Sequence, residues 1–157
     1  MKLLTVVLIL TSRLSHADSA DYPIGPIRQL TPGSLCQKPS TFRYPERVPY
    51  CERNVPIELK QQVYGAYRRA GFQMRSRNRE DYKLDHLIPL CAGGSNEPTN
   101  LWPQHISIFT ITDPMEALGC EKLKQGRVKH QVLVSILLQA KTDLRKVPAV
   151  IQYLEKL

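Results

Sequence analysis

The spacing of apolar and polar residues divides the chain into a leading apolar run, an irregular segment and a body of helices and short strands. Residues 3–11 (LLTVVLILT) form a largely apolar run of nine. Residues 18–35 then carry three prolines and two glycines without periodicity, which predicts an N-terminal arm on the surface. Residues 43–51 (RYPERVPYC) continue as an extended segment.

Helical periodicity follows this segment and recurs to the end of the chain. Leu59, Val63 and Tyr67 stand at helical spacing, and Asn54 is a residue type that caps helix N-termini. Short segments at 82–84 and 100–102, on either side of a Gly-Gly loop, predict a hairpin of two strands. The expected fold class is therefore α+β, a small hairpin among several helices. The predicted helices span about 56–70, 112–124, 129–143 and 147–156.

The leading segment has the composition of an export signal. Lys2 supplies a positive start, the apolar run follows, and Ser15 and Ala17 have the small side chains and spacing that a signal peptidase reads. A run of nine is too short to span a bilayer, which takes about 20 residues. We expect residues 1–17 to be a signal peptide, with cleavage after Ala20 as the alternative. The mature protein, with no membrane span, would be periplasmic or secreted; a buried N-terminal helix is the other interpretation.

Charge and cysteine content narrow the class of protein. The formal charge of +8 falls to +6 without residues 1–17, which hold Lys2 and Arg13 and no acid. Such an excess favours polyanions such as nucleic acid, anionic lipid or acidic glycans. Four cysteines in an exported chain predict two disulfides, and none of them has the short spacing of zinc ligands. Of the three possible pairings we favour Cys36–Cys51 with Cys91–Cys120.

The stretch DHLIPLCAGGSNEPTNLW at 85–102 places an acid beside a histidine and an asparagine fourteen residues later. Phosphodiester hydrolysis needs a base for the attacking water, which neutral histidine supplies near pH 7, and positive charge on the phosphate, which a divalent metal supplies. Asp85 and His86 are adjacent, so both serve one site only where the strand ends and the backbone turns. Asn100 can hold the loop by side-chain to backbone bonds and thereby orient the histidine. A hairpin whose polar residues make only turn bonds is the alternative.

The pattern D-H-L-I-P-L-x-x-G-G-S-N-x-x-x-N-L-W-P-Q at 85–104 resembles the HNH endonuclease family. Weaker agreement covers most of 31–125, where TPGSLC, RYPERVPYC and PQHISIFTITDPME are similar to an exported, disulfide-bearing subgroup. The resemblance implies a ββα-metal (HNH) fold, two strands and a helix that supplies a further metal ligand, in a single nuclease domain at 36–157. It also implies that Asp85 binds the metal, that His86 is the general base and that Asn100 orients this base.

The remaining metal ligands are open. The resemblance implies an acidic pair at the start of the following helix, which matches Asp113 and Glu116, with Glu116 ranked first. The same D-P-M-E is also a helix-capping arrangement, with Asp113 as N-cap. His105 could be a ligand, a phosphate contact or a surface histidine. Because oxygen ligands dominate, Mg²⁺ or Mn²⁺ is expected before Zn²⁺ or Ni²⁺.

A run of arginines precedes the predicted catalytic strand. Because a guanidinium donates two hydrogen bonds at once, we expect these residues to position a nucleic-acid backbone without reading bases. The alternative is a solvated loop balanced by Glu80 and Asp81. No recognition helix or aromatic ladder is present, so sequence preference should be weak, with DNA expected ahead of RNA. The five arginines are Arg68, Arg69, Arg75, Arg77 and Arg79.

These features predict an exported, metal-dependent, monomeric endonuclease. A second hypothesis is a catalytically inactive HNH-like module that holds nucleic acid or a surface partner. A third is a small exported structural protein, for which the disulfides suffice but the pattern at 85–104 has no explanation.

Overall fold

The computed structural model of the chain describes residues 21–74 and 79–157. The expected signal peptide at 1–17, the first residues of the 18–35 arm, and Arg75 and Arg77 lie outside the described residues. No helix within the described ranges is long and apolar enough to cross a membrane.

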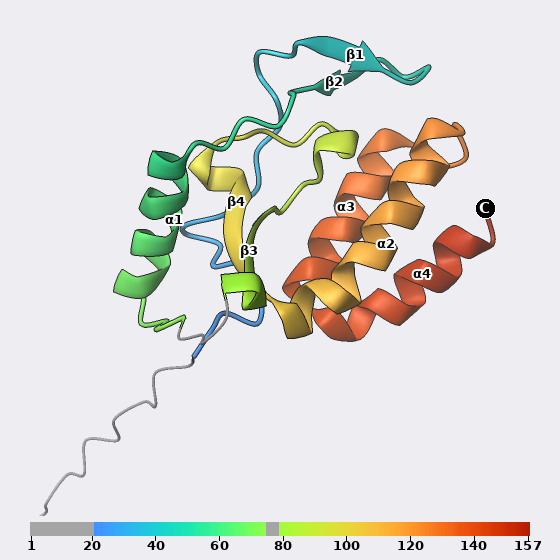
Figure 1. Cartoon of the computed structure of the whole chain (residues 1–157). Coiled ribbons are helices and arrows are strands. Elements are labelled where there is room, and N and C mark those ends of the chain that lie inside the picture. The colour runs from blue at the N-terminus through green and yellow to red at the C-terminus, as the bar shows by residue number, and fades with distance from the viewer. Residues whose placement is uncertain (1–20, 75–78) are drawn as a thin grey trace, which may run out of the picture.

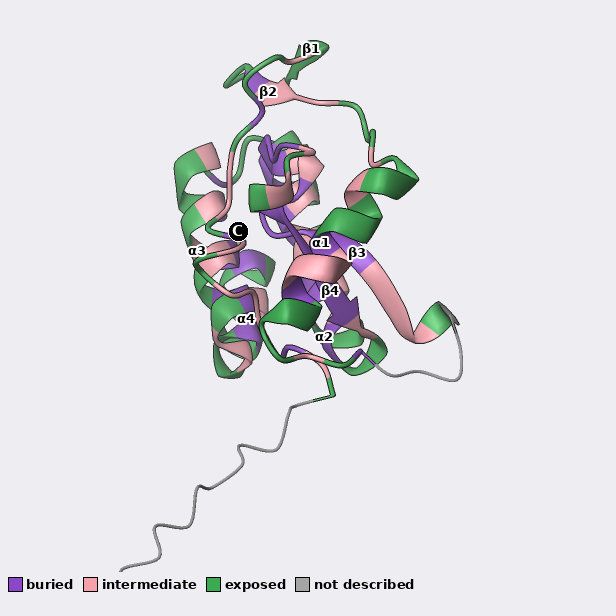
Figure 2. Ribbon diagram, turned by 90° about the vertical axis from the view of Figure 1, so that its left-hand side faces the viewer, coloured by how far each residue is buried: buried purple, intermediate pink, exposed green. Residues whose placement is uncertain are grey.

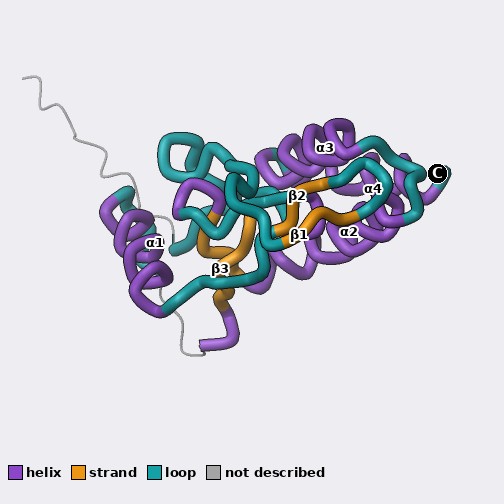
Figure 3. The backbone as a smooth tube through the Cα atoms, turned by 90° about the horizontal axis from the view of Figure 1, so that it is seen from above, coloured by secondary structure: helices purple, strands orange, loops and turns teal. Residues whose placement is uncertain are grey.

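The centre of the molecule is an antiparallel hairpin of β3 (Tyr82–His86) and β4 (Leu101–His105), with His86 opposite Leu101. Helix α1 (Ile57–Arg69) lies on one side of this hairpin, and three helices lie together on the other side (Figure 1; Figure 3). These are α2 (Ile106–Lys124), α3 (His130–Thr142) and α4 (Val147–Glu155). The described chain is therefore α+β, as the sequence predicts.

Two apolar clusters hold these layers together. One joins α1 to the hairpin through Val63, Tyr67 and the fully buried Trp102. The other joins α2, α3 and α4 to the β3–β4 loop, with Met115 and Leu137 at its centre. The hairpin and its loop are buried between the two, whereas the upper part of the molecule is largely exposed (Figure 2).

That upper part is a second hairpin, β1 (Thr41–Arg43) paired with β2 (Val48–Tyr50), which stands out from the body (Figure 1). Its base is tied by the disulfide Cys36–Cys51, and Cys91–Cys120 joins the β3–β4 loop to α2. Both disulfides confirm the favoured pairing. The extended segment predicted at 43–51 is therefore a turn and a strand of this small hairpin.

Helix α2 begins six residues before its predicted start. His105 caps it, since its side chain accepts the amide of Ser107, and the helix passes through Pro114 without ending. Ile108, Met115 and Leu123 are buried along one face on both sides of the proline. Burial of this face offsets the backbone hydrogen bond that proline cannot make. The capping interpretation of Asp113 was therefore wrong, because this residue lies inside the helix.

Two further expectations need correction. Helix α1 begins after Pro56 and has no side-chain cap, so Asn54 is not its N-cap. The described part of the predicted arm packs on the body: Thr31 is 1% exposed, and its hydroxyl contacts the Tyr67 hydroxyl and donates to the carbonyl of Leu101. Short 3-10 turns at Arg79–Asp81, Leu90–Ala92, Pro98–Asn100 and Leu144–Lys146 complete the described structure.

Candidate functional site

The loop between β3 and β4 is held from inside by Asn100, which is fully buried. Its Oδ1 accepts the amide of Ile88 at 2.9 Å, and its Nδ2 donates to the carbonyls of Ile88 and Ser95 at 3.0 and 2.9 Å. These are the side-chain to backbone contacts that the sequence led us to expect. They fix the loop that follows His86, while a part in catalysis stays a prediction.

His86 ends strand β3 beneath two polar side chains and is 3% exposed. Arg53 Nη1 donates to His86 Nδ1 at 3.3 Å, and His86 Nε2 donates to Asn96 Oδ1 at 3.0 Å. Because arginine only donates, Nδ1 must carry the lone pair and Nε2 the proton. Asn96 Nδ2 donates to the carbonyl of Glu52 at 2.7 Å, which fixes the direction of the amide.

The surroundings keep this imidazole neutral. Burial lowers the pKa of His86, and the positive charge of Arg53 lowers it further. The hydrogen bond to Asn96 acts in the opposite direction, but the pKa stays below its ordinary value. A neutral histidine is the form that accepts a proton from water, although Arg53 donates to its Nδ1 lone pair in this structure.

An open hollow of about 460 Å³ lies over the two partners of His86. Arg53, Asn96 and the exposed Lys38 line it. A second hollow shares Asn96 and Lys38 and extends to Pro98. A molecule in the first hollow therefore meets Arg53 and Asn96, and it reaches His86 only when one of them moves.

Asp85 has different partners from His86 and belongs to a buried ionic cluster. Its Oδ2 lies 3.0 Å from Nζ of Lys141, a residue of α3 with no exposed surface. The same Nζ donates to the carbonyl of His86 at 2.6 Å and lies 2.5 Å from Glu116 Oε1. The contact with Glu116 is an ion pair, and the buried Oε1 of Glu116 makes no hydrogen bond with any described residue.

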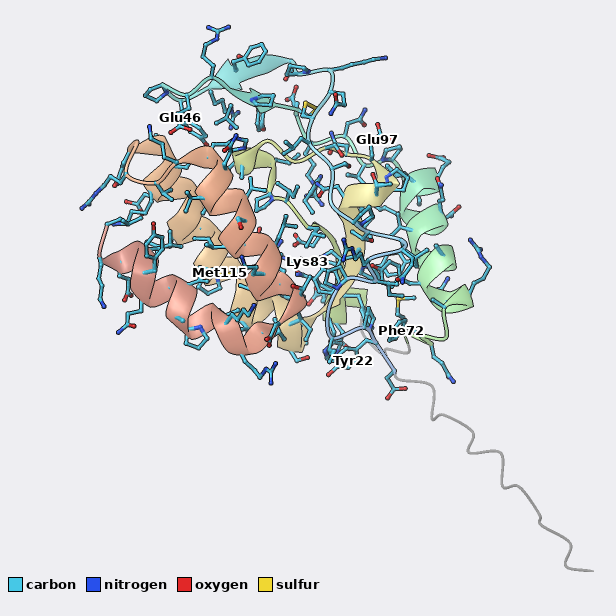
Figure 4. The ribbon with its side chains drawn as sticks, turned by 180° about the vertical axis from the view of Figure 1, so that it is seen from behind. Tyr22, Glu46, Phe72, Lys83, Glu97 and Met115 are labelled. Carbon is cyan, nitrogen blue, oxygen red and sulfur yellow. A yellow bond between two sulfur atoms is a disulfide. The ribbon has the colours of Figure 1, made fainter. Side chains whose placement is uncertain are left out.

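Lys83 extends the cluster towards solvent. Its Nζ donates to both carboxylate oxygens of Asp113, at 2.6 and 2.8 Å, and lies 3.5 Å from Asp85 Oδ1. Figure 4 shows Lys83 near the middle of the molecule, on the side of Met115, a residue of α2. The structure thus brings Asp85, Glu116 and Asp113 to one region, each beside a lysine.

Burial and charge act against each other in this cluster. Burial alone would raise the pKa of Asp85, but the charges of Lys141 and Lys83 hold it below its ordinary value. Burial would lower the pKa of Lys141, but Asp85 and Glu116 raise it. For Glu116 burial prevails and, with the charge of Asp85, raises its pKa to about 7 against the charge of Lys141.

Glu116→Gln should therefore change how stability depends on pH. Between pH 4.5 and about 7 the folded protein holds a proton on Glu116 that the unfolded chain has released, so this group makes the native state less stable as pH rises. The variant lacks this loss. The difference in the free energy of unfolding, variant minus wild type, should therefore increase by up to roughly 3 kcal/mol as the pH rises from 4.5 to 8.

Urea unfolding of both proteins at several pH values measures this difference. The pKa of Asp85 is lowered from 3.8, so its effect on stability falls below this pH range. The pKa of His86 is also lowered, and its opposite slope is present in both proteins. Glu121→Gln, at an exposed position of the same helix, is the matched control. A constant difference between wild type and Glu116→Gln across this range would contradict the assignment.

The cluster does not fit a divalent metal ion as it is arranged. Such an ion needs several oxygen ligands around one point. Asp85 Oδ2, Glu116 Oε1 and the carbonyl of His86 do converge, but the ammonium of Lys141 is at that point. Among residues 21–74 and 79–157, no group of three or more histidines, cysteines or acids is placed to hold a metal.

His105 lies away from His86. Its ring stacks on Tyr22 with centroids 4.0 Å apart, and its Nδ1 accepts the amide of Ser107. It pairs with Tyr82 at the far end of the hairpin, about 13 Å along the strand from His86. In Figure 4, Tyr22 and Glu97, the neighbour of Asn96, lie at opposite ends of this part of the molecule.

Three of the five predicted nucleic-acid-binding arginines lie within the described residues, and none of the three lies near His86. Arg68 and Arg69 are exposed in the last turn of α1, whereas Arg53 precedes the first turn. The helix separates the two positions by about 18 Å. Arg79 lies in the short turn before β3, at the end of the strand remote from His86. A role for these residues in binding nucleic acid stays a prediction.

Three residues of the site were not predicted. Asn96 lies inside the 85–104 pattern, but no chemistry was assigned to it. Arg53 carries no motif and reaches His86 from a segment 33 residues earlier. Lys141 had a signal: it follows Leu133 and Leu137 at intervals of four, so it is a lysine on the buried face of α3.

No protein-family model matches this chain, and neither a curated protein nor a solved structure matches it.

Proposed function

We propose that this chain is an exported endonuclease of the HNH type, which hydrolyses phosphodiester bonds of nucleic acid with His86 as general base. One observation carries the proposal: a neutral, buried imidazole turns its Nδ1 lone pair towards an arginine that lines an open polar hollow. The chain order β3, β4, α2 supports it, because two strands followed by a helix are the order that the resemblance at 85–104 implies.

Arg53 is the residue that meets a phosphate first. Its side chain is exposed, and its contact with Nδ1 is long at 3.3 Å. A phosphodiester offers charged oxygens to the guanidinium, and such bonds are stronger than a bond to a neutral ring nitrogen. When Arg53 turns to the phosphate, Nδ1 is free to take a proton from the attacking water. The water oxygen bonds to phosphorus while the bond from phosphorus to the leaving oxygen breaks, and the leaving oxygen takes a proton from solvent. The same guanidinium then stabilises the charge that develops on the phosphate.

Asn96 and Asn100 keep His86 in place during this step. The bond to Asn96 Oδ1 retains the proton on Nε2, so Nδ1 stays the basic atom. Asn100 holds the loop that leads away from the histidine. A requirement for Mg²⁺ or Mn²⁺ is not part of this proposal, because Asp85 and Glu116 are already paired with Lys141.

Nucleic acid is the substrate class that charge favours. The chain without residues 1–17 has a formal charge of +6, and Lys38 and Arg53 line the hollow over the site. Lysine and arginine side chains bind the phosphate backbone rather than the bases, so we propose little sequence preference. We also propose DNA as the substrate ahead of RNA, and a monomeric enzyme. Export is compatible with the two disulfides.

Nicking of supercoiled plasmid by the oxidised protein tests the proposal. Wild type should nick the plasmid, and His86→Ala should lower the rate roughly 10²-fold or more, because the base is lost. His105→Ala is the matched control and should keep most of the activity, since this histidine lies at the far end of the hairpin. Each protein is assayed with Mg²⁺, with Mn²⁺ and with EDTA. An intact plasmid under all three conditions would end the nuclease proposal.

The second candidate function is an HNH-like module that binds nucleic acid without cutting it. The observation in its favour is Lys141, which takes up the carboxylates that would hold a catalytic metal. Retarded migration of a DNA fragment in a gel, together with an intact plasmid in every nicking assay, would select this candidate.

A further inference from the structure

We propose that Lys141 is the resident cation of the Asp85–Glu116 site, and that its ammonium group replaces a divalent metal ion there. The inference concerns the cation that this site holds, so it does not rest on the proposed nuclease activity. It predicts that the folded wild-type protein binds no divalent metal ion at this site.

The geometry is that of a cation in an oxygen cage. Three oxygen atoms surround Lys141 Nζ: Asp85 Oδ2 at 3.0 Å, the carbonyl of His86 at 2.6 Å and Glu116 Oε1 at 2.5 Å. They come from β3 and α2, while the ammonium arrives from α3. Carboxylate and carbonyl oxygens are also the ligands of hard divalent ions. The cage therefore has suitable chemistry for a metal but already holds a cation.

Burial makes this lysine dependent on its cage. Lys141 has no exposed surface, and a buried charge without partners is strongly destabilising. Removing either carboxylate would leave the ammonium short of a counter-charge. Asp85 and Glu116, two of the three acids that the sequence suggests as metal ligands, are thus explained by their pairing with Lys141.

The charge balance also opposes a second cation. Lys83 already compensates Asp113 and approaches Asp85 from the solvent side. Asp85, Asp113 and Glu116 therefore share two ammonium groups. A divalent ion in the cage would lie against Lys141 Nζ, where like charges repel each other strongly at low dielectric. It could bind only if the lysine left a site in which it is fully enclosed.

Binding of Mn²⁺, in the absence of nucleic acid, tests the inference by isothermal titration calorimetry. Wild type should show no Mn²⁺ site that depends on Asp85. Lys141→Ala, which frees the two carboxylates, should bind one Mn²⁺ at least tenfold more tightly than any Mn²⁺ binding measured on wild type, and Mn²⁺ should raise its unfolding temperature. The double variant Lys141→Ala with Asp85→Asn is the matched control and should lose the gain. A folded Lys141→Ala protein that gains no affinity would overturn the inference.

A measurement on wild type alone covers the case in which Lys141→Ala does not fold. Bound Mn²⁺ broadens the NMR signals of nearby amides, so the amides of Asp85, His86 and Glu116 report directly on the cage. At a few equivalents of Mn²⁺ these signals should keep their intensity. Selective loss of the three signals would place the metal in the cage and refute a resident lysine. Because no step involves DNA, the result is readable whether or not the protein cuts plasmid.

Discussion

Gly94→Ala should prevent the chain from reaching a stable native state. A Cβ added to Gly94 would lie 1.8 Å from the carbonyl oxygen of Ile88 and 2.8 Å from Asn100 Nδ2. The first neighbour is backbone, and the second belongs to a side-chain amide that three hydrogen bonds hold, so neither can move aside easily. Leu35 also bridges to Gly94, which ties the N-terminal segment to the same point. We expect a loss of more than about 4 kcal/mol in the free energy of unfolding.

Circular dichroism during thermal and urea unfolding measures this loss. Gly65→Ala is the matched control, because its Cβ would have only the flexible end of Arg69 near it, at 3.4 Å. In the middle of α1, alanine should stabilise the protein by about 0.5–1 kcal/mol. Native-like stability of Gly94→Ala would show that the loop has another conformation available.

Asn100→Ala should lower the free energy of unfolding by about 3–4 kcal/mol. The substitution removes three buried hydrogen bonds, each of which contributes about 1 kcal/mol, and leaves the amide of Ile88 without the partner that it has in the wild type. The surrounding loop is fixed by the Cys91–Cys120 disulfide and cannot easily turn these groups to water. The same change should impair any activity that depends on the position of His86.

Urea unfolding again measures the free energy of unfolding. Asn54→Ala, at an exposed position, is the matched control, and its free energy of unfolding should lie within about 0.5 kcal/mol of the wild-type value. A cost below 1 kcal/mol for Asn100→Ala would mean that the loop is held by other contacts. Reduced activity in a variant of full stability would instead point to a direct role of Asn100 in the chemistry.

Local patterns predicted most of the elements. Helices α1, α3 and α4 begin and end within one residue of their predicted limits, because each carries an apolar face of regular period. Strands β3 and β4 overlap the segments predicted at 82–84 and 100–102 on either side of the Gly-Gly loop, and each extends further towards its C-terminal end. The start of α2 was misplaced because Asp113-Pro114 is a strong local start signal, and only the packing of Ile108 against the hairpin core shows that the helix begins earlier.

The same division applies to the candidate site. The sequence by itself determined the β3–β4 loop and the role of Asn100 in holding it. His86, Gly94 and Asn100 lie within one short segment, where their spacing restricts the geometry. It also favoured one of three possible disulfide pairings, and the structure contains that pairing. In these cases the partners are near in the chain or few in number, so few arrangements compete.

Only the tertiary structure decided which side chains complete the site. Arg53 reaches His86 from 33 residues before it, and Lys141 reaches Asp85 from 56 residues after it. No spacing rule relates residues so far apart, because their meeting depends on how α1 and α3 pack against opposite sides of the hairpin. The sequence therefore indicated a carboxylate site that needs a cation, and the packing of α3 decided that a buried lysine is the cation it holds.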